Sequence, residues 1–307
     1  MSTAFRITQR SIHERSLTNL SLNLETMARF QERLSSGRLI NRPSDNPTGT
    51  VSAMQYRADI RRVEQFSRNA VDGSNWLGVA DSTMQQVLTA TGRIRELILR
   101  ASNGSVDTDG RDAIAAEVDS LRQNIIDLAN TKFLDRPIFA GTEQTNLAYD
   151  ATGTYLGDGA PPVDPEAGPE GRVERNVAPG VNVRVNLTGP EVFGDPAVGD
   201  LFATLTQLST DLRTNPANLS TDLQALDVHI DTIENQLAKL GARHRQIEAM
   251  RQKADDNIML IKNGLSEVED IDLPQTIVDL QLQEVAYRAA LDATSRVIQP
   301  SLLDFLR

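Results

Sequence analysis

A regular spacing of apolar residues through residues 219–268 constrains the fold more than any other feature of this 307-residue chain. The residues recur at alternating steps of three and four, and thirteen of the fifteen positions are apolar if alanine is counted. The stripe consists of Leu219, Leu223, Leu226, Ile230, Ile233, Leu237, Leu240, His244, Ile247, Arg251, Ala254, Ile258, Ile261, Leu265 and Val268. About seven heptads of this quality predict one long helix that packs along others as in a coiled coil.

Further helices are predicted from the same spacing elsewhere in the chain. The stripe in residues 13–34 consists of Leu17, Leu20, Leu24, Met27, Gln31 and Leu34. This helix should stop near Gly37, because glycine adopts the left-handed conformation that ends many helices. Another stripe extends from Tyr56 to Ala101, and a final helix is expected from Gln275 to Ile298, after Pro274.

A shorter helix is predicted beyond the turn signal Asn103-Gly104. Asp109, Gly110 and Asp112 are expected to form its turn and N-cap, since short polar side chains accept hydrogen bonds from the first backbone amides. Its apolar positions are Ile114, Val118, Leu121, Ile125 and Leu128. We expect it to form the return arm of a helical hairpin.

Residues 142–200 differ from the rest of the chain because they are rich in Gly, Pro and Asp. Residues 172–177 and 181–187 alternate in polarity, and Ala178-Pro179-Gly180 between them can form a turn. This pattern predicts a β-hairpin within a small β-rich insertion. Four prolines in residues 161–170 indicate an exposed loop.

The fold class that follows is mainly α. We expect an elongated, folded-back antiparallel bundle of long, coiled-coil-like helices with a small β-rich inserted domain. The predicted parts are an N-terminal assembly and export helix (1–40), two halves of a helical rod (41–141 and 201–272), the insertion (142–200) and a C-terminal assembly helix (273–307). Both terminal helices carry an apolar stripe without an obvious core of their own, which implies partners.

Composition excludes several classes of function. The net charge of −11 disfavours binding to nucleic acid, because phosphates repel an acidic chain. The absence of cysteine excludes disulfides, thiolate metal sites and cysteine nucleophiles. No apolar run is long enough to span a bilayer, and the first fifteen residues do not form a standard secretory signal. No convergent polar site indicates an enzyme, and we expect no metal or cofactor.

Residues 34–49, with the sequence LSSGRLINRPSDNPTG, resemble the LSSGxxIxxxxDxPxG signature of bacterial flagellins and their relatives. The spacing is intact across all sixteen residues, and the alanine-rich face of residues 286–293 also resembles the family's C-terminal helix. The resemblance covers about residues 1–140 and 200–307. Residues 129–141, residues 153–158 (GTYLGD) and the opening FRIT at residues 5–8 further resemble the hook-associated branch of the family at the hook-filament junction.

The resemblance implies a structural subunit of the bacterial flagellum, located outside the cell at the hook-filament junction. It implies export through the flagellar type III apparatus with a cytoplasmic chaperone. The partners it implies are further copies of the chain, hook-associated protein 1 and flagellin, with no nucleic acid and no membrane. The expected assembly interface is Leu17, Leu20, Leu24, Met27, Leu34, Ile277, Leu280, Leu291, Ile298, Leu302 and Phe305. The expected spoke loop between inner and outer layers contains Gly37, Asn41, Pro43, Asp45, Pro47 and Gly49.

Two other functions are compatible with the sequence. A filament flagellin would share the same terminal motifs but form the whole filament, and abundance along the flagellum would distinguish it. A cytoplasmic coiled-coil adaptor would be absent from sheared flagella. For Asp45, a role confined to stabilising a turn is as compatible with the sequence as a role in the spoke.

Overall fold

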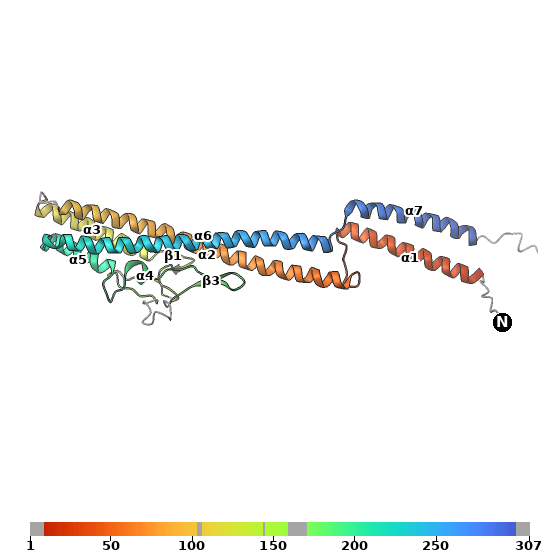
Figure 1. Ribbon diagram of the computed structural model, residues 1–307, viewed down its shortest axis with the longest axis horizontal. Helices are drawn as coiled ribbons and strands as arrows, with labels where there is room; N and C mark the ends of the chain where they lie inside the picture. The colour runs from red at the N-terminus through yellow and green to blue at the C-terminus, as the bar shows by residue number, and fades with distance from the viewer. Residues whose placement is uncertain (1–8, 103–105, 144, 159–170, 299–307) are drawn as a thin grey trace, which may run out of the picture. The chain divides into compact units, whose positions relative to one another are not determined.

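The computed structural model describes residues 9–102, 106–143, 145–158 and 171–298 (Figure 1). The chain divides into two compact units. Unit 1 comprises residues 1–61 and 258–307, and unit 2 comprises residues 62–257. Two long helices contribute one part of their length to each unit.

Long helices dominate the structure, which confirms the predicted fold class. They are α1 (Gln9–Ser36), α2 (Pro47–Ala101), α3 (Thr108–Ala129), α4 (Gly189–Phe193), α5 (Leu201–Thr214), α6 (Leu219–Glu269) and α7 (Leu273–Ile298), with one 3-10 turn, η1 (Pro216–Asn218). Two short antiparallel hairpins consist of β1 (Lys132–Phe133) with β2 (Arg136–Pro137), and β3 (Glu174–Ala178) with β4 (Val181–Arg184). Among the described residues, none of the helices has the length and apolar character needed to cross a membrane.

In unit 2, α2 and α6 run antiparallel. Ser74 Oγ lies 3.0 Å from His244 Nε2, and Arg95 Nε donates to Asp227 Oδ1 at 2.6 Å. A later residue of α2 therefore meets an earlier residue of α6. Helix α3 packs against α5, and one large hydrophobic core connects α2, α3, α5 and α6.

The apolar stripe of α6 lies in that core where the helix passes through unit 2. Every seventh position from Leu219 is buried, namely Leu219, Leu226, Ile233, Leu240, Ile247 and Ala254. The positions between them, Leu223, Ile230 and Leu237, are half-buried and pack against the same core. The stripe therefore predicted both the helix and the face that it buries.

The predicted N-cap of α3 was wrong. The structure places the cap at Asp107, whose Oδ1 accepts a hydrogen bond from Gly110 N at 2.9 Å, and the helix begins at Thr108. Asp109 and Asp112 lie inside the first turns, where Asp109 interacts favourably with the helix dipole. Several short polar residues in one stretch offer alternative caps, and the path of the preceding chain selects one.

The predicted hairpin in the insertion is confirmed. Strands β3 and β4 pair around the Pro179-Gly180 turn, and Gly180 has a φ of +72°. Arg175 Nε donates to Asp72 Oδ2 at 2.6 Å, which fixes the hairpin to α2. Helix α4, which was not predicted, follows the hairpin, and residues 161–170 lie outside the described residues.

Candidate functional site: the paired terminal helices and their loop

Helices α1 and α7 lie side by side and antiparallel in unit 1 (Figure 1). Gln283 Nε2 donates to Asn23 O at 3.3 Å and lies 3.2 Å from Asn23 Oδ1. At the other end of the pair, Ile271 N donates to Gly37 O at 3.2 Å. The two predicted assembly helices are thus neighbours although they lie at opposite ends of the sequence.

The seam between these helices is only half-buried. Side chains on the facing sides of α1 and α7 include Leu20, Met27, Phe30, Leu34, Leu280, Tyr287 and Ala290. No side chain between residues 14 and 36 is fully buried, and Thr276 is the one buried side chain between residues 273 and 295. Two helices without a third layer cannot shield their apolar surface, so this pair lacks the core that unit 2 has.

The predicted interface residues fall into three groups. Leu20, Met27, Leu34 and Leu280 lie in the seam and are half-buried. Leu17, Leu24, Ile277 and Leu291 are exposed, by between 38 and 51%. Ile298 ends α7, but its side chain lies outside the described part of the chain, as do residues Leu302 and Phe305 altogether.

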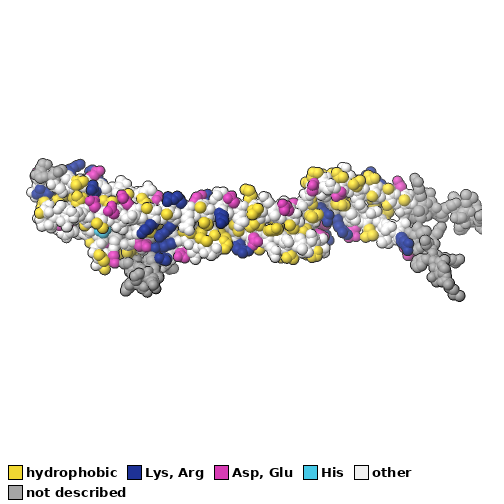
Figure 2. Space-filling model, in the orientation of Figure 1, with side chains coloured by type: hydrophobic (Ala, Val, Ile, Leu, Met, Phe, Trp, Pro, Cys, Tyr) yellow, Lys and Arg dark blue, Asp and Glu magenta, His cyan; other side chains and the backbone are white. Residues whose placement is uncertain are grey.

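A second apolar stripe on α7 was missed by the sequence analysis. Val278, Leu282 and Val285 follow one another at steps of four and three and are 49, 63 and 65% exposed. They lie on the side of α7 opposite the α1 seam. Figure 2 shows hydrophobic side chains along the surface of this helix pair. The spacing was visible in the sequence, but only the structure shows that α1 covers the other face.

The loop that follows α1 pairs through its backbone with the short segment that connects α6 and α7. Gly37 has a φ of +72°, as expected for a residue that ends a helix. Leu39 N donates to Glu269 O at 2.6 Å, and Arg38 forms an isolated antiparallel bridge with Asp270. This backbone pairing aligns the start of the loop with the start of α7.

A buried carboxylate strengthens the same connection. Glu269 is 4% exposed. Its Oε1 accepts a hydrogen bond from Arg57 Nη2 and forms an ion pair with Arg38 Nε at 3.0 Å. A buried charge is tolerated only where such partners compensate for its lost hydration. Since Arg38, Arg57 and Glu269 come from the loop, α2 and α6, the cluster holds three segments of unit 1 together.

Asp45 organises the rest of the loop. Its Oδ2 accepts hydrogen bonds from Arg42 N at 2.8 Å and Asn41 N at 3.2 Å. The bond from Arg42 N is the main reason that the pKa of Asp45 lies below its ordinary value. Its role as a turn-stabilising side chain is therefore evident, and its role in a spoke stays a prediction.

The end of the loop begins α2. Asn46 Oδ1 accepts a hydrogen bond from Gly49 N at 2.9 Å, and Pro47 occupies the first helical position, which tolerates a missing amide proton. A Cβ on Gly49 would lie 2.7 Å from Ile40 Cδ1 and Asn46 Nδ2. Pro47 and Gly49 of the signature thus have local structural roles, and Asn46 was missed as the cap. Pro43 lines a cavity of about 340 Å³ with Arg38, Ile40 and Arg57.

A pH dependence follows from Asp45. Because its pKa is lowered in the folded loop, its stabilising effect is present above the unfolded pKa, near 3.8, and is lost as pH falls through the lower folded value. NMR titration should show the Asp45 carboxyl group titrating below pH 3.8, and the loop amides of Asn41 and Arg42 losing protection over the same range. In Asp45→Asn these amides should exchange faster at neutral pH. An ordinary titration at Asp45 would contradict the assigned hydrogen bonds.

In unit 2, the segments that resemble the junction branch meet in one place. Asn130 Oδ1 accepts hydrogen bonds from Ala148 N at 2.8 Å and Tyr149 N at 2.9 Å. The Tyr155 hydroxyl lies 2.5 Å from Asp158 O and 3.0 Å from Phe139 O, and its single proton can be donated to either carbonyl. Burial raises the pKa of Tyr155, so its hydroxyl stays protonated as a donor. Residues 129–141 and 153–158 therefore form a single structural node.

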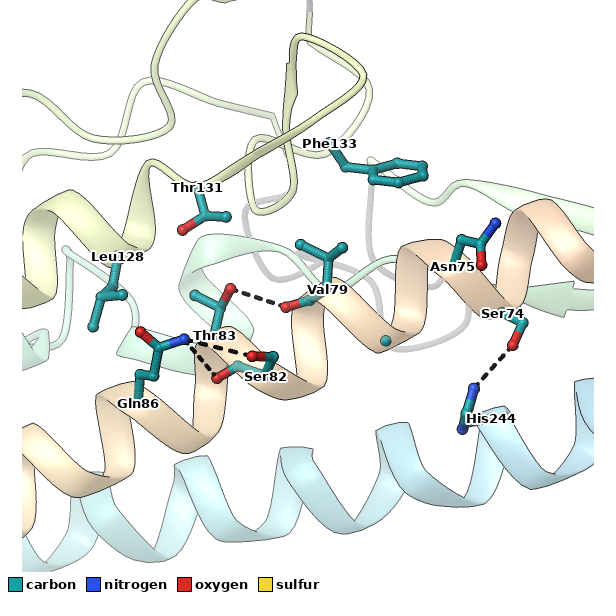
Figure 3. Close-up of a pocket in the computed structure, with 11 residues that line it drawn as sticks. Ser74, Asn75, Val79, Ser82, Thr83, Gln86, Leu128, Thr131, Phe133 and His244 are labelled. Atoms are coloured by element: carbon teal, nitrogen blue, oxygen red, sulfur yellow. Dashed lines mark hydrogen bonds between the residues drawn. The ribbon is translucent and has the colours of Figure 1, made fainter.

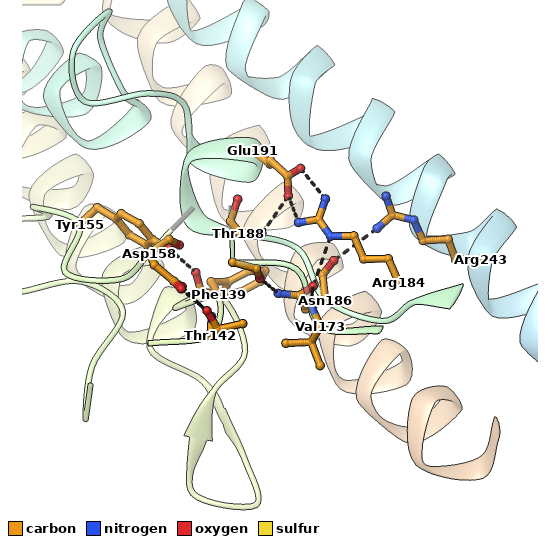
Figure 4. A network of polar contacts seen from close by, with 11 residues as sticks. Phe139, Thr142, Tyr155, Asp158, Val173, Arg184, Asn186, Thr188, Glu191 and Arg243 are labelled. Carbon is orange, nitrogen blue, oxygen red and sulfur yellow. Dashed lines mark hydrogen bonds and ion pairs between the residues drawn. The ribbon is translucent and has the colours of Figure 1, made fainter. Parts of the chain in front are cut away.

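Asp158 closes this node (Figure 4). Its carboxylate accepts hydrogen bonds from Thr142 N and Oγ1 and from Glu143 N, and its own amide donates to Ala140 O at 3.1 Å. Gly141 has a φ of +74° and no room for a side chain, since a Cβ would lie 2.0 Å from Asp158 Oδ1. Position 141 thus requires glycine, because the Asp158 carboxylate occupies the space that a side chain would need.

An ion pair connects the β3–β4 hairpin with α4 (Figure 4). Arg184 donates to both carboxylate oxygens of Glu191, at 2.8 and 2.7 Å. Burial opposes ionisation of Glu191, but the hydrogen bonds from Arg184 and Thr188 N outweigh it and keep the pKa of Glu191 below its ordinary value. Since Arg184 is largely buried, this bidentate pair fixes the insertion rather than offering a charged site to a ligand.

Comparison with known proteins gives a consistent result. Residues 7–144 match the family model for the bacterial flagellin N-terminal helical region. Flagellar hook-associated protein 3 of Escherichia coli is 23% identical over 313 residues, covering 94% of this chain and 95% of the relative. Flagellin of Bacillus subtilis is 23% identical over 286 residues, covering 89% and 90%. The resemblance predicted from residues 34–49 is confirmed.

The fold is also found among solved structures. The flagellar hook-associated protein 3 of Legionella pneumophila superposes with a TM-score of 0.59 at 16% identity, over 70% of this chain and 98% of that chain. At this level of identity the likeness concerns the fold alone. It supports the arrangement of long helices with a small strand region described above.

Proposed function

We propose, from the match of residues 7–144 to the family model for the bacterial flagellin N-terminal helical region, that this structural protein joins the hook to the filament of the flagellum. It is not an enzyme, in keeping with its relatives, which are flagellar structural proteins. The proposal has three parts: assembly through the terminal helices, a place at the junction, and export before folding. Each part has its own support.

The single observation that carries assembly is the uncovered apolar surface of the α1–α7 pair. Leu17 and Leu24 on α1, and the stripe of Val278, Leu282 and Val285 on α7, are between 43 and 65% exposed. No described part of the chain covers them. Burial of apolar surface stabilises association by about 25 cal/mol per Å², so neighbouring copies that cover these faces would be held together. Residues 1–40 and 273–307 are accordingly proposed as the assembly segments.

The Asn130–Asp158 node favours the junction over the filament. It unites the motifs in which the chain resembles the hook-associated branch of the family, and its glycines and Asp158 are needed for one local geometry. Hook-associated protein 1 on the hook side and flagellin on the filament side are the proposed neighbours. A filament flagellin is the second candidate, because flagellin of Bacillus subtilis matches nearly as much of the chain.

Export in an unfolded state is supported by the weakness of unit 1. A helix pair without a buried core gains little stability before assembly, whereas coupled folding and binding on the growing structure would supply it. The type III apparatus and a cytoplasmic chaperone are the proposed route, and the flagellum outside the cell is the proposed location. The absence of cysteine suits this route because no disulfide has to form.

Immunogold labelling of intact flagella tests the proposal. We expect gold only at the hook end of each filament, and loss of filaments in a deletion strain, restored by the full chain. Label along the whole filament would favour the flagellin alternative. Label confined to the cytoplasm, with none in sheared flagella, would favour the adaptor and contradict a flagellar role.

A further inference from the structure

The tip of the β1–β2 hairpin has an unfavourable conformation. Lys132 pairs with Pro137 and Phe133 pairs with Arg136, so Leu134 and Asp135 form a two-residue turn. Both have positive φ, +50° for Leu134 and +61° for Asp135, and no other described residue apart from glycine does. Such turns normally contain Asn-Gly, because a leucine in the left-handed region places its Cβ against the backbone.

The leucine at this tip is also exposed. Leu134 is 76% exposed, which within the described residues is exceeded among large hydrophobic side chains by Val198 alone. It therefore contributes neither to the turn nor to the core of its own chain. Strain that folding does not require is usually retained where a side chain has a separate role.

The base of the hairpin is rigid. Phe133 packs edge-on against Trp76 of α2, with ring centroids 5.6 Å apart, and Ile138 N donates to Thr131 O at 3.0 Å. The strained tip therefore projects from a fixed position in unit 2. A rigid apolar projection loses little conformational entropy when it binds.

A groove of about 720 Å³ lies beside the hairpin in the same unit (Figure 3). One wall consists of small α2 side chains, Ser74, Gly78 and Ser82, and the other of Leu128 and Phe133. A Cβ placed on Gly78 would meet no atom within 4 Å. The groove is thus open above Gly78. Its lining combines the apolar Val79, Leu128 and Phe133 with polar side chains, and an apolar side chain from another molecule could contact those three residues.

We propose that Leu134 of one copy of this chain inserts into the groove at Gly78 of a neighbouring copy. Overall charge supports a second copy as the occupant. The tip is flanked by the exposed cations Lys132 and Arg136, and unit 2 as a whole has 29 acidic residues against 18 Lys and Arg, although no carboxylate of the described residues lines the groove itself. Projection and groove are different surfaces, so the contact is heterologous and generates rings or helices. The inference rests on the proposed function, because it assumes that copies stand side by side in the flagellum.

Two substitutions separate this role from folding. Leu134→Asn relieves the strained turn, and Gly78→Leu improves helix propensity and fills the groove. Each should raise the Tm of the full chain by about 1–4 °C, while the amount recovered in sheared flagella falls at least about tenfold. Gly92→Ala is the matched control, since Gly92 also lies in α2 with no atom within 4 Å of a Cβ. It should raise the Tm without changing recovery.

Cysteine cross-linking tests the contact itself, because the natural chain has no cysteine. Cells would express Leu134→Cys and Gly78→Cys as separate chains, so that a disulfide between the two positions can form only between copies. The control is the same experiment with Leu134→Cys and Gly92→Cys. In isolated flagella we expect the amount of disulfide-linked dimer from the Leu134→Cys and Gly78→Cys pair to be at least about tenfold higher than from this control.

The possible outcomes are distinct. If both variants reach the flagellum but the linked dimer does not exceed the control, the proposed insertion is wrong. The insertion is equally wrong if Leu134→Asn and Gly78→Leu leave the amount of protein recovered in sheared flagella unchanged. If these variants selectively lose binding to another flagellar protein, the tip binds that protein and not a second copy. Absence of the unmodified chain from flagella would contradict the proposed function rather than this contact.

Discussion

Replacing the outward stripe of α7 with polar residues of similar shape should abolish incorporation into flagella while the fold of unit 2 remains intact. The variant is Val278→Thr, Leu282→Gln and Val285→Thr. These side chains are between 49 and 65% exposed, so a neighbouring copy that covers them gains about 1 kcal/mol from each. Losing about 3 kcal/mol weakens each contact roughly 150-fold, and this loss is repeated in every copy of the assembly.

The measurement compares the fraction of protein in sheared flagella with the helix content and Tm of the purified chain. A matched control makes the same chemical changes at exposed apolar positions of unit 2: Val71→Thr, Leu99→Gln and Val228→Thr. These residues are between 42 and 63% exposed. If the control is excluded from flagella as strongly as the α7 variant, the stripe has no special role. If the α7 variant assembles normally, assembly does not depend on this face.

Gly141→Ala should destabilise unit 2 by about 3–5 kcal/mol. An alanine at a φ of +74° costs about 1–2 kcal/mol by itself. Its Cβ would also lie 2.0 Å from Asp158 Oδ1 and 2.6 Å from Asp158 O, so the carboxylate must leave the amides of Thr142 and Glu143. Hydrogen bonds to a charged group contribute about 1.5–3 kcal/mol, which accounts for the remainder.

Gly180→Ala separates the two causes. Gly180 has nearly the same φ, +72°, but a Cβ there would meet nothing within 4 Å. Its cost should therefore be about 1 kcal/mol, from backbone conformation alone. Urea unfolding of both variants, followed by circular dichroism, measures the difference. Equal losses would show that the contact with Asp158 contributes nothing to the stability of the node.

The helices could be predicted because their cause is local. The three-four spacing in residues 219–268 reflects which side chains share one face of a helix, and that geometry is the same in any fold. The stop at Gly37 also follows from local conformational preference. Helix α7, in contrast, begins at Leu273 rather than at the predicted Gln275, because its first turn accommodates Pro274. The N-cap of α3 could not be predicted in the same way. Asp107, Asp109 and Asp112 have the same side chain, and only the course of the preceding residues in the folded structure makes Asp107 the cap.

The burial of charges could not be predicted either. Glu269 is one of several acidic residues near the end of α6, and its sequence neighbours do not distinguish it. It is buried because Arg38 and Arg57, more than 200 positions away, meet it there. Asp45 differs, because its partners Asn41 and Arg42 lie within four residues, and a role in a turn was accordingly among the expectations.

The sequence by itself determined the long helices, the hairpin of the insertion and the family resemblance, since periodicity and turn chemistry act over a few residues. Only the tertiary structure decided which face of α7 is covered by α1 and which is left exposed, because a helix can carry several apolar stripes and its neighbours determine which one is buried. It also revealed the strained Leu134 turn, whose residues contradict local preference. The conformation persists because the base of the hairpin is fixed, with Phe133 packed against Trp76, and this leaves Leu134 and Asp135 to close the turn.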